Sequence, residues 1–88
     1  MIKIIHRVND IDDLIKIPNN FGVEIDIRFE NNSLVLAHDL DEHKENFQEY
    51  INFYDHNLLV ANIKESGIEN KVIEACKEKK IKNFFLLD

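Results

Sequence analysis

Two carboxylates and a guanidinium share one face of a predicted β-strand near the start of the chain. From Val23 to Phe29, polar and apolar residues alternate strictly, which is the period of a β-strand. Glu24, Asp26 and Arg28 therefore lie on one face of this strand, and the apolar residues lie on the other. Two carboxylates at positions i and i+2 point the same way, and their oxygens suit a hard divalent cation. The alternative left open is a solvated strand face on which Arg28 pairs with both carboxylates.

Polar side chains also follow the other predicted strands at the point where each strand ends. They are His6 and Arg7 after the run 2–5, His38 and Asp39 after the run 34–37, and Asn62 and Lys64 at the end of the segment 58–64. These strands are mostly apolar on both faces and alternate with helical segments, which is typical of parallel strands joined by right-handed crossovers. In such folds the carboxyl ends of the strands share one rim, where sites are built. The sequence therefore predicts a site at this rim.

The segments between the strands carry turn and helix signals. Asn9 or Asp10 is placed to cap a short helix that ends before Pro18. Asn31-Asn32 predicts a tight turn, because asparagine tolerates positive φ. Apolar residues at helical spacing predict two further helices, over residues 47–54 and 68–78. The predicted order of elements is β-α-β-β-α-β-α-β.

Size and composition limit the architecture and the partners. The chain has 88 residues, which suits one domain (1–88), and its 44% apolar and 32% charged residues are the balance of a globular protein. The net charge of −6 disfavours nucleic acid and anionic membranes as partners. No segment reaches transmembrane length, and the first residues hold too short an apolar run for a signal peptide. The single cysteine, Cys76, fits a reducing compartment, so a cytoplasmic location is expected.

The order and spacing of the polar groups resemble the glycerophosphodiester phosphodiesterase family, within the wider group of phosphatidylinositol-phospholipase-C-like phosphodiesterases. The resemblance is carried by His-Arg at 6–7, Gly-Val-Glu-Ile-Asp-Ile-Arg at 22–28, Leu-Val-Leu-Ala-His-Asp at 34–39 and Asn-Ile-Lys at 62–64. It implies an eight-stranded (β/α) barrel that hydrolyses a small phosphodiester with two histidines and a divalent cation, Mg²⁺ or Ca²⁺. Lipid metabolism is the setting that the resemblance implies.

The resemblance also implies a role for each polar side chain of the predicted site. The expected set is His6 and His38 as the acid–base pair, Arg7 and Lys64 as phosphate contacts, and Glu24, Asp26 and Asn62 as metal ligands. Members of the family typically carry a glutamate at the position of Asn62 and a glycine at the position of Val8. An amide oxygen can bind a hard cation but contributes no charge, so the expected metal site is weaker than in the family.

The length of the chain sets the expected fold at about half of such a barrel. A (β/α) barrel takes roughly 200 residues or more. The expectation is therefore an α/β fold with about the first four parallel βα units of a (β/α)8 TIM-type barrel and a β-hairpin extension after the second strand. The exposed strand edges of half a barrel predict a homodimer or larger species. The expected function is a metal-dependent phosphodiester hydrolase or a truncated form of one. The alternative is a phosphate- or polyol-phosphate-binding module without turnover, or an inactive half-barrel.

Overall fold

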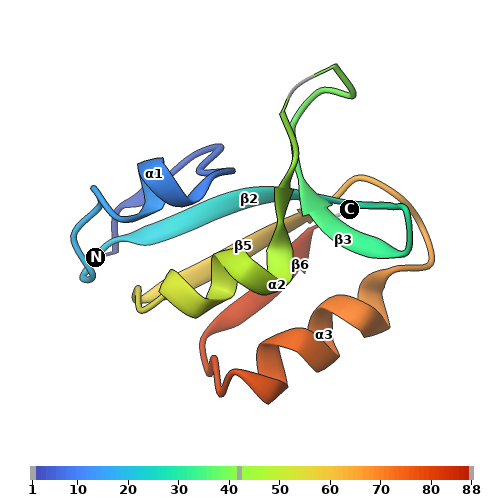
Figure 1. Cartoon of the computed structure of the whole chain (residues 1–88). Helices are drawn as coiled ribbons and strands as arrows, with labels where there is room; N and C mark the ends of the chain where they lie inside the picture. Colours follow the sequence, from blue (N-terminus) through green and yellow to red (C-terminus); the bar gives the residue numbers. More distant parts are fainter. Residues whose placement is uncertain (1, 42, 88) are drawn as a thin grey trace.

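Six strands form one sheet, around which the helices are arranged (Figure 1). The computed structural model describes residues 2–41 and 43–87. In chain order the elements are β1 (Ile4–Ile5), α1 (Ile11–Leu14), β2 (Gly22–Glu30), β3 (Ser33–Leu36), β4 (Glu45–Asn46), α2 (Phe47–Tyr50), the 3₁₀ helix η1 (Ile51–Phe53), β5 (Leu58–Ile63), α3 (Glu69–Glu78) and β6 (Phe84–Leu87). The strand predicted around the two carboxylates is confirmed as β2. None of the helices in this described part of the chain is long and apolar enough to cross a membrane.

The sheet is mixed, because β3 and β4 run against their neighbours. Its strand order is β4-β3-β2-β5-β6, and β1 also pairs with β2. The pairs β1–β2, β2–β5 and β5–β6 are parallel, whereas β2–β3 and β3–β4 are antiparallel. β1 lies beside the beginning of β2, with Ile4 opposite Gly22, and β3 lies beside its end, with Leu36 opposite Ile27. β5 pairs along the opposite edge of β2. β2 is therefore the strand that has neighbouring strands on both edges along most of its length.

The prediction of about the first four parallel βα units of a (β/α)8 barrel is wrong. Two of the five strand pairings are antiparallel, and α1 and α2 have only four residues each. The turn after β2 explains the antiparallel pairing, since Asn31 and Asn32 have φ of 50° and 63°. Positive φ at both central residues of a two-residue loop is the type I′ geometry that closes an antiparallel hairpin. The tight turn predicted at these asparagines is confirmed.

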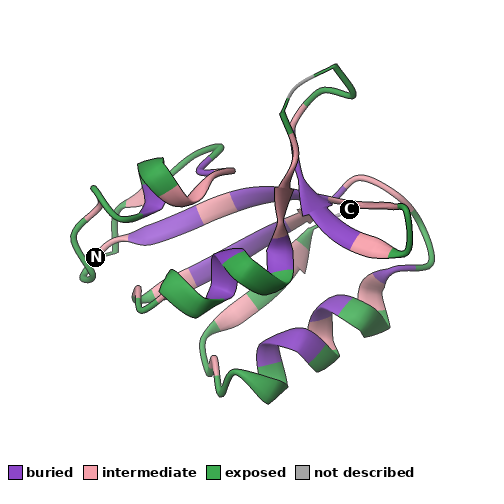
Figure 2. Cartoon of the chain, in the orientation of Figure 1, coloured by how far each residue is buried: buried purple, intermediate pink, exposed green. Residues whose placement is uncertain are grey.

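The hydrophobic core lies between the sheet and the helices α2 and α3, which cover the same side of it (Figure 1). Figure 2 shows buried residues on the sides of these helices that face the strands and exposed residues on their outer sides. Because side chains alternate along a strand, the apolar residues of β2 face this core and its charged residues face the opposite side. The buried core residues are Val8, Leu14, Val23, Ile25, Ile27, Leu34, Leu36, Phe47, Tyr50, Ile51, Leu59, Ala61, Ile63, Ile68, Val72, Ala75 and Cys76.

Gly22 lies where three parallel strands meet. It pairs with Ile4 of β1 on one side and with Leu58 of β5 on the other. A Cβ atom at this position would lie 3.2 Å from Ile4 Cγ1, from Leu58 Cβ and from the Leu58 carbonyl oxygen. Such contacts are tighter than normal packing, and one of them is to backbone. The absence of a side chain at Gly22 therefore lets the short strand β1 lie against β2.

Burial of Cys76 on α3 predicts a loss of stability at alkaline pH. The side chain is fully buried, and burial raises the pKa of its thiol from 9.0 to about 11. The unfolded chain releases this proton at a lower pH than the folded chain, so the free energy of unfolding falls as the pH rises from 9.0 to about 11. A shift of this size corresponds to about 3 kcal/mol.

Urea unfolding of the wild type and of Cys76→Ala, at neutral pH and near the upper end of this range, tests the prediction. Burial also raises the pKa of Tyr50 and of Tyr54, and this contribution is present in both proteins. The stability of the wild type should therefore fall more steeply with pH than that of the variant. Equal slopes would contradict the assignment to Cys76.

The outer edge of β6 predicts self-association. Within residues 2–41 and 43–87, β6 pairs with β5 alone, and Phe85 and Leu87 are 44% and 46% exposed. An unpaired strand edge with apolar side chains is a template for pairing with another chain. We therefore expect a homodimer or larger species, and replacement of Phe85 by lysine should shift it toward monomer. Sedimentation velocity over a range of protein concentrations measures this, and a wild type that stays monomeric throughout would contradict the expectation.

Candidate functional site

Strand β2 carries the two carboxylates at the centre of the candidate site. Glu24 and Asp26 lie two residues apart, so their side chains emerge from the same face, about 7 Å apart along the strand. Asn62 of β5 is opposite Asp26 in the strand register, which places its side chain on this face as well. Lys64 follows the last residue of β5, and His6 follows the last residue of β1. The structure thus brings the three predicted metal ligands to one face of the sheet.

Asp26 is the buried charge of the site, with only 1% of its surface exposed. Its backbone N–H donates to Asn9 Oδ1 at 2.8 Å, and Asn9 Nδ2 donates back to Asp26 Oδ2 at 3.0 Å. His38 Nδ1 lies 3.4 Å from Asp26 Oδ2, and Lys64 Nζ lies 3.6 Å from Asp26 Oδ1. A buried carboxylate is stable only with such partners. The Asn9 amide, His38 and Lys64 therefore supply the partners that this buried carboxyl group needs and keep it in place.

A second histidine–carboxylate pair lies next to the first. His6 Nδ1 is 3.1 Å from Glu24 Oε1, and the His6 side chain is 74% exposed. In both pairs Nδ1 is the ring nitrogen that faces the carboxylate, so Nε2 is the nitrogen left for another partner. The His38 Nδ1 atom is buried, and its approach to Asp26 is not aligned as a hydrogen bond.

The loop after β1 is held against β2 from two directions. The Val8 N–H donates to the Glu24 carbonyl oxygen at 2.8 Å, and the Tyr50 hydroxyl donates to the Val8 carbonyl oxygen at 2.6 Å. Burial raises the pKa of Tyr50, so this hydroxyl keeps its proton at all physiological pH values. Immediately before this anchored residue, Arg7 has a φ of 56°, a left-handed conformation that non-glycine residues rarely adopt. Arg7 is exposed and follows His6 in the sequence.

Arg28 holds the backbone that carries His38. Its Nε donates to the Ala37 carbonyl oxygen at 3.0 Å, and its Nη2 donates to the His38 carbonyl oxygen at 2.7 Å. These bonds join the end of β3 to β2, and the Ala37 N–H also donates to the Asp26 carbonyl oxygen at 3.0 Å. The expectation that Arg28 pairs with the two carboxylates is wrong. The guanidinium positions His38 through its main chain.

Each of the three predicted metal ligands carries a side-chain oxygen. Glu24 and Asp26 are carboxylates, but Asn62 is an uncharged amide. Among the described residues, no group of three or more histidine, cysteine, aspartate or glutamate side chains is placed to hold a metal ion. A cation at this face would therefore need the amide oxygen of Asn62 beside Glu24 and Asp26. Both Asp26 oxygens already face positively charged or hydrogen-bonding groups. The donor types fit a hard divalent cation, and the contacts of Asp26 would rearrange on binding.

Sequence reasoning missed the roles of Asn9 and Tyr50. Asn9 was expected at most to cap the first helix, but Asp10 is the cap, with its Oδ1 accepting from the Asp13 N–H at 2.8 Å. The reciprocal bonds between Asn9 and Asp26 join residues 17 apart in sequence, and a local pattern does not signal such a contact. Tyr50 lies in the helix predicted over residues 47–54 from its apolar spacing, and its side chain is fully buried. The one available signal was that a buried tyrosine hydroxyl needs a partner.

This arrangement can perform acid–base chemistry on an anionic substrate. Two histidines present free Nε2 atoms, each paired with a carboxylate through Nδ1. Lys64 adds a positive charge beside Asp26, and Arg7 adds one beside His6. Comparisons of the chain with protein-family models, with curated proteins and with solved structures each gave no match.

Proposed function

We propose that the chain is a phosphodiester hydrolase of the glycerophosphodiester phosphodiesterase type, with His6 and His38 as its acid–base pair. The observation that carries the proposal is that each histidine turns Nδ1 to a carboxylate, His6 to Glu24 at 3.1 Å and His38 to Asp26 at 3.4 Å. The resemblance of four sequence segments to that family supports the same activity. The barrel of the family is no part of the proposal, because the sheet here is mixed.

In the proposed mechanism, each group of residues has a separate role in phosphodiester cleavage. One neutral histidine accepts the proton of the attacking hydroxyl at Nε2, and the other, protonated, donates a proton to the leaving alkoxide. The carboxylates Glu24 and Asp26 stabilise the imidazolium forms and fix the tautomers. Lys64 and Arg7 neutralise charge that develops on the phosphoryl oxygens. The attacking group is water or a neighbouring hydroxyl of the substrate.

We also propose that a divalent cation, Mg²⁺ or Ca²⁺, binds at Glu24, Asp26 and Asn62. Two carboxylates and an amide oxygen on one face of neighbouring strands are ligands of the type these ions prefer. When bound, the cation supplies further charge neutralisation at the phosphate. Because one of the three ligands is an uncharged amide, we expect weak binding that requires an excess of metal.

Hydrolysis of bis(p-nitrophenyl) phosphate and of a glycerophosphodiester by the purified chain tests the proposal. We expect release of product that depends on Mg²⁺ or Ca²⁺ and stops when EDTA is added. Circular dichroism of the same sample establishes that the chain is folded. A folded chain with no turnover above the buffer rate, at saturating metal, would rule out catalysis by this chain.

A second candidate function is binding of a phosphate or polyol phosphate without turnover. It is favoured by the contacts of Asp26, whose two oxygens already face Asn9, His38 and Lys64. A carboxylate engaged in this way is less available as a metal ligand. Calorimetry that detects binding of a glycerophosphodiester, together with no hydrolysis of it, would support this second function over the first.

We propose a cytoplasmic location and a small phosphodiester as the partner of this site. The location is supported by the use of a single cysteine, Cys76, which is buried in the core and has no disulfide. The net charge of −6 argues against a nucleic-acid backbone as the phosphodiester. Periplasmic or secreted protein recovered by cell fractionation would overturn the assigned location.

A further inference from the structure

The face of the sheet that carries the candidate site also carries a pair of exposed apolar side chains, Phe85 and Leu87. In the strand register, Asp26 of β2 is opposite Asn62 of β5, and Asn62 is opposite Leu87 of β6. Residues paired in this way on parallel strands point to the same face, and side chains alternate along each strand. Leu87 and Phe85 therefore lie on the face of Asp26. The remaining residues of β6 pack against the core on the other face.

Both side chains of this apolar pair are open to solvent. Phe85 is 44% exposed and Leu87 is 46% exposed. Val60, which is opposite Phe85 in the register, is only 4% exposed. The apolar surface that a ligand can reach is therefore that of the pair. Single exposed apolar residues need no explanation, whereas two together beside the polar groups of a site point to a ligand.

Leu87 is within reach of a ligand that is bound at the charged groups. Neighbouring strands are about 4.8 Å apart, so Leu87 is about 5 Å from Asn62 and about 10 Å from Asp26 across the sheet. Lys64 Nζ lies 3.6 Å from Asp26 Oδ1, so a phosphate bound by Lys64 lies close to this row of residues. The row passes from charge at β2 to apolar surface at β6. It suits a ligand that has a charged part and an apolar part.

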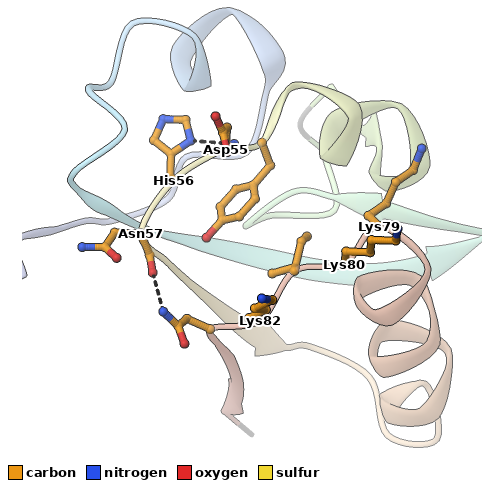
Figure 3. Close-up of a pocket in the computed structure, with 9 residues that line it drawn as sticks. Asp55, His56, Asn57, Lys79, Lys80 and Lys82 are labelled. Carbon is orange, nitrogen blue, oxygen red and sulfur yellow. Dashed lines mark hydrogen bonds between the residues drawn. The ribbon is translucent and has the colours of Figure 1, made fainter.

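Two hollows of the structure lie elsewhere and offer no place for the apolar part of such a ligand. One, of about 210 Å³, lies between residues 54–57 and 79–83, at the amino ends of β5 and β6 (Figure 3). Lys64 and Leu87 lie at the carboxyl ends of these strands. A second hollow, of about 260 Å³, is lined by α2, α3 and the β2–β3 hairpin, on the core side of the sheet. The surface next to the charged groups is therefore the open sheet face.

We propose that the substrate is an amphiphilic phosphodiester, whose phosphate binds beside Lys64 and whose alkyl or aromatic substituent binds to Phe85 and Leu87. The proposal rests on the proposed function for the position of the phosphate, and it adds the class of substituent. Phe85 and Leu87 are then specificity-determining residues. Because these contacts are the same in the ground state and in the transition state, they lower KM and leave kcat unchanged.

A second copy of the chain is the other candidate to cover this apolar pair. Pairing along the outer edge of β6, which we expect for self-association, uses main-chain groups of the strand. The side chains of Phe85 and Leu87 project from the face of the sheet, so edge pairing leaves them open. Their position beside Asn62 therefore favours a ligand of the site over a second copy.

NMR titration of ¹⁵N-labelled protein with simple phosphodiesters, in excess Mg²⁺, tests the proposal. Dimethyl phosphate carries no large apolar group, whereas methyl hexyl phosphate and methyl phenyl phosphate each carry one. We expect at least one of the apolar esters to bind about tenfold tighter than dimethyl phosphate, since it covers the exposed surface of the pair. The same ester should shift the backbone amides of Asn62, Phe85 and Leu87. Whichever apolar ester binds more tightly identifies the substituent as alkyl or aromatic.

Hexanol is the control for apolar contact alone. It lacks the phosphate, so it should bind at least tenfold more weakly than the hexyl ester. Phosphorus NMR of the same samples measures how much of each ester stays intact. If the chain hydrolyses the esters, the preferred apolar ester should show a lower KM than dimethyl phosphate.

Variants assign the preference to the apolar pair. Phe85→Ala and Leu87→Ala should each weaken binding of the preferred apolar ester about fivefold, and neither should change binding of dimethyl phosphate. If the esters are hydrolysed, both variants should raise KM for that ester at unchanged kcat. Phe53→Ala is the matched control, since Phe53 of η1 is 53% exposed and directly follows α2 on the core side of the sheet (Figure 1). This control should keep the preference of the wild type.

Two results would overturn the proposal. The first is that the folded wild type binds the apolar esters no more tightly than dimethyl phosphate, which is also the result expected if a second copy covers the pair. The second is an unchanged preference in both Phe85→Ala and Leu87→Ala. Failure of the proposed function gives a different result, in which the apolar esters bind preferentially but stay intact in the phosphorus spectra.

Discussion

Replacement of His38 by glutamine is expected to lower phosphodiester turnover by about 10²- to 10⁴-fold, the usual contribution of a general acid or base. The side chain of His38 lies against Asp26, and its main chain is held by Arg28 at 2.7 Å. Glutamine keeps a polar side chain of similar reach but cannot transfer a proton near neutral pH. His6→Gln should lose activity to a similar extent, because the mechanism needs both an acid and a base. Initial rates with bis(p-nitrophenyl) phosphate measure both effects.

His43→Gln is the matched control for this prediction. His43 is an exposed histidine in the segment between β3 and β4. This variant should retain the wild-type rate. If His38→Gln keeps more than half of the wild-type rate while remaining folded, the assignment of His38 to proton transfer is wrong. If His43→Gln also loses activity, the loss in His38→Gln reflects a general effect of replacing a histidine, such as reduced stability, and does not identify His38 as a proton-transfer group.

Replacement of Asp26 by alanine is expected to lower the free energy of unfolding by about 2–3 kcal/mol. The change leaves Asn9 Nδ2 without its acceptor and removes the negative charge that faces His38 and Lys64. Those two side chains are 29% and 25% exposed, so water compensates part of the loss and the cost stays below that of breaking a fully buried ion pair. Urea unfolding followed by circular dichroism near neutral pH measures the difference.

Glu24→Ala is the comparison that separates the effect of burial from the effect of removing a carboxylate. The Glu24 side chain is 17% exposed and its partner His6 is 74% exposed, so this pair behaves as a surface ion pair. We expect a change below about 1 kcal/mol. Equal destabilisation by the two substitutions would show that the buried contacts of Asp26 with Asn9, His38 and Lys64 stabilise the fold no more than the exposed pair of Glu24 and His6.

The local features of the fold were predictable because they depend on neighbouring residues. The strict alternation around Glu24 and Asp26 predicted β2, and the pair Asn31-Asn32 predicted the turn that follows it. Asp10 was one of two candidates for the helix cap and is the residue that caps. In each case the signal and its consequence lie within a few residues of each other.

The arrangement of the strands was not predictable in the same way. A period of two specifies which face of a strand is buried, but it does not specify the neighbouring strand or its direction. The resemblance to a barrel family supplied parallel βα units with a hairpin extension after the second strand, whereas the sheet is mixed, with β3 antiparallel to β2 and β4 antiparallel to β3. Contacts such as Asn9 with Asp26, or Arg28 with the His38 carbonyl, depend on this arrangement. They are visible only in the folded chain.

The shortness of β1 has a consequence for the motion of His6. Only Ile4 and Ile5 pair with β2, and the fit of this pairing depends on the missing side chain of Gly22. A strand with only two paired residues is expected to open at a far lower free energy than the core strands β2 and β5. We therefore expect the His6–Glu24 pair to break and reform more often than the contacts of the buried Asp26. Of the two histidines, we expect the less exposed His38 to be the more firmly held and His6 to be the more mobile.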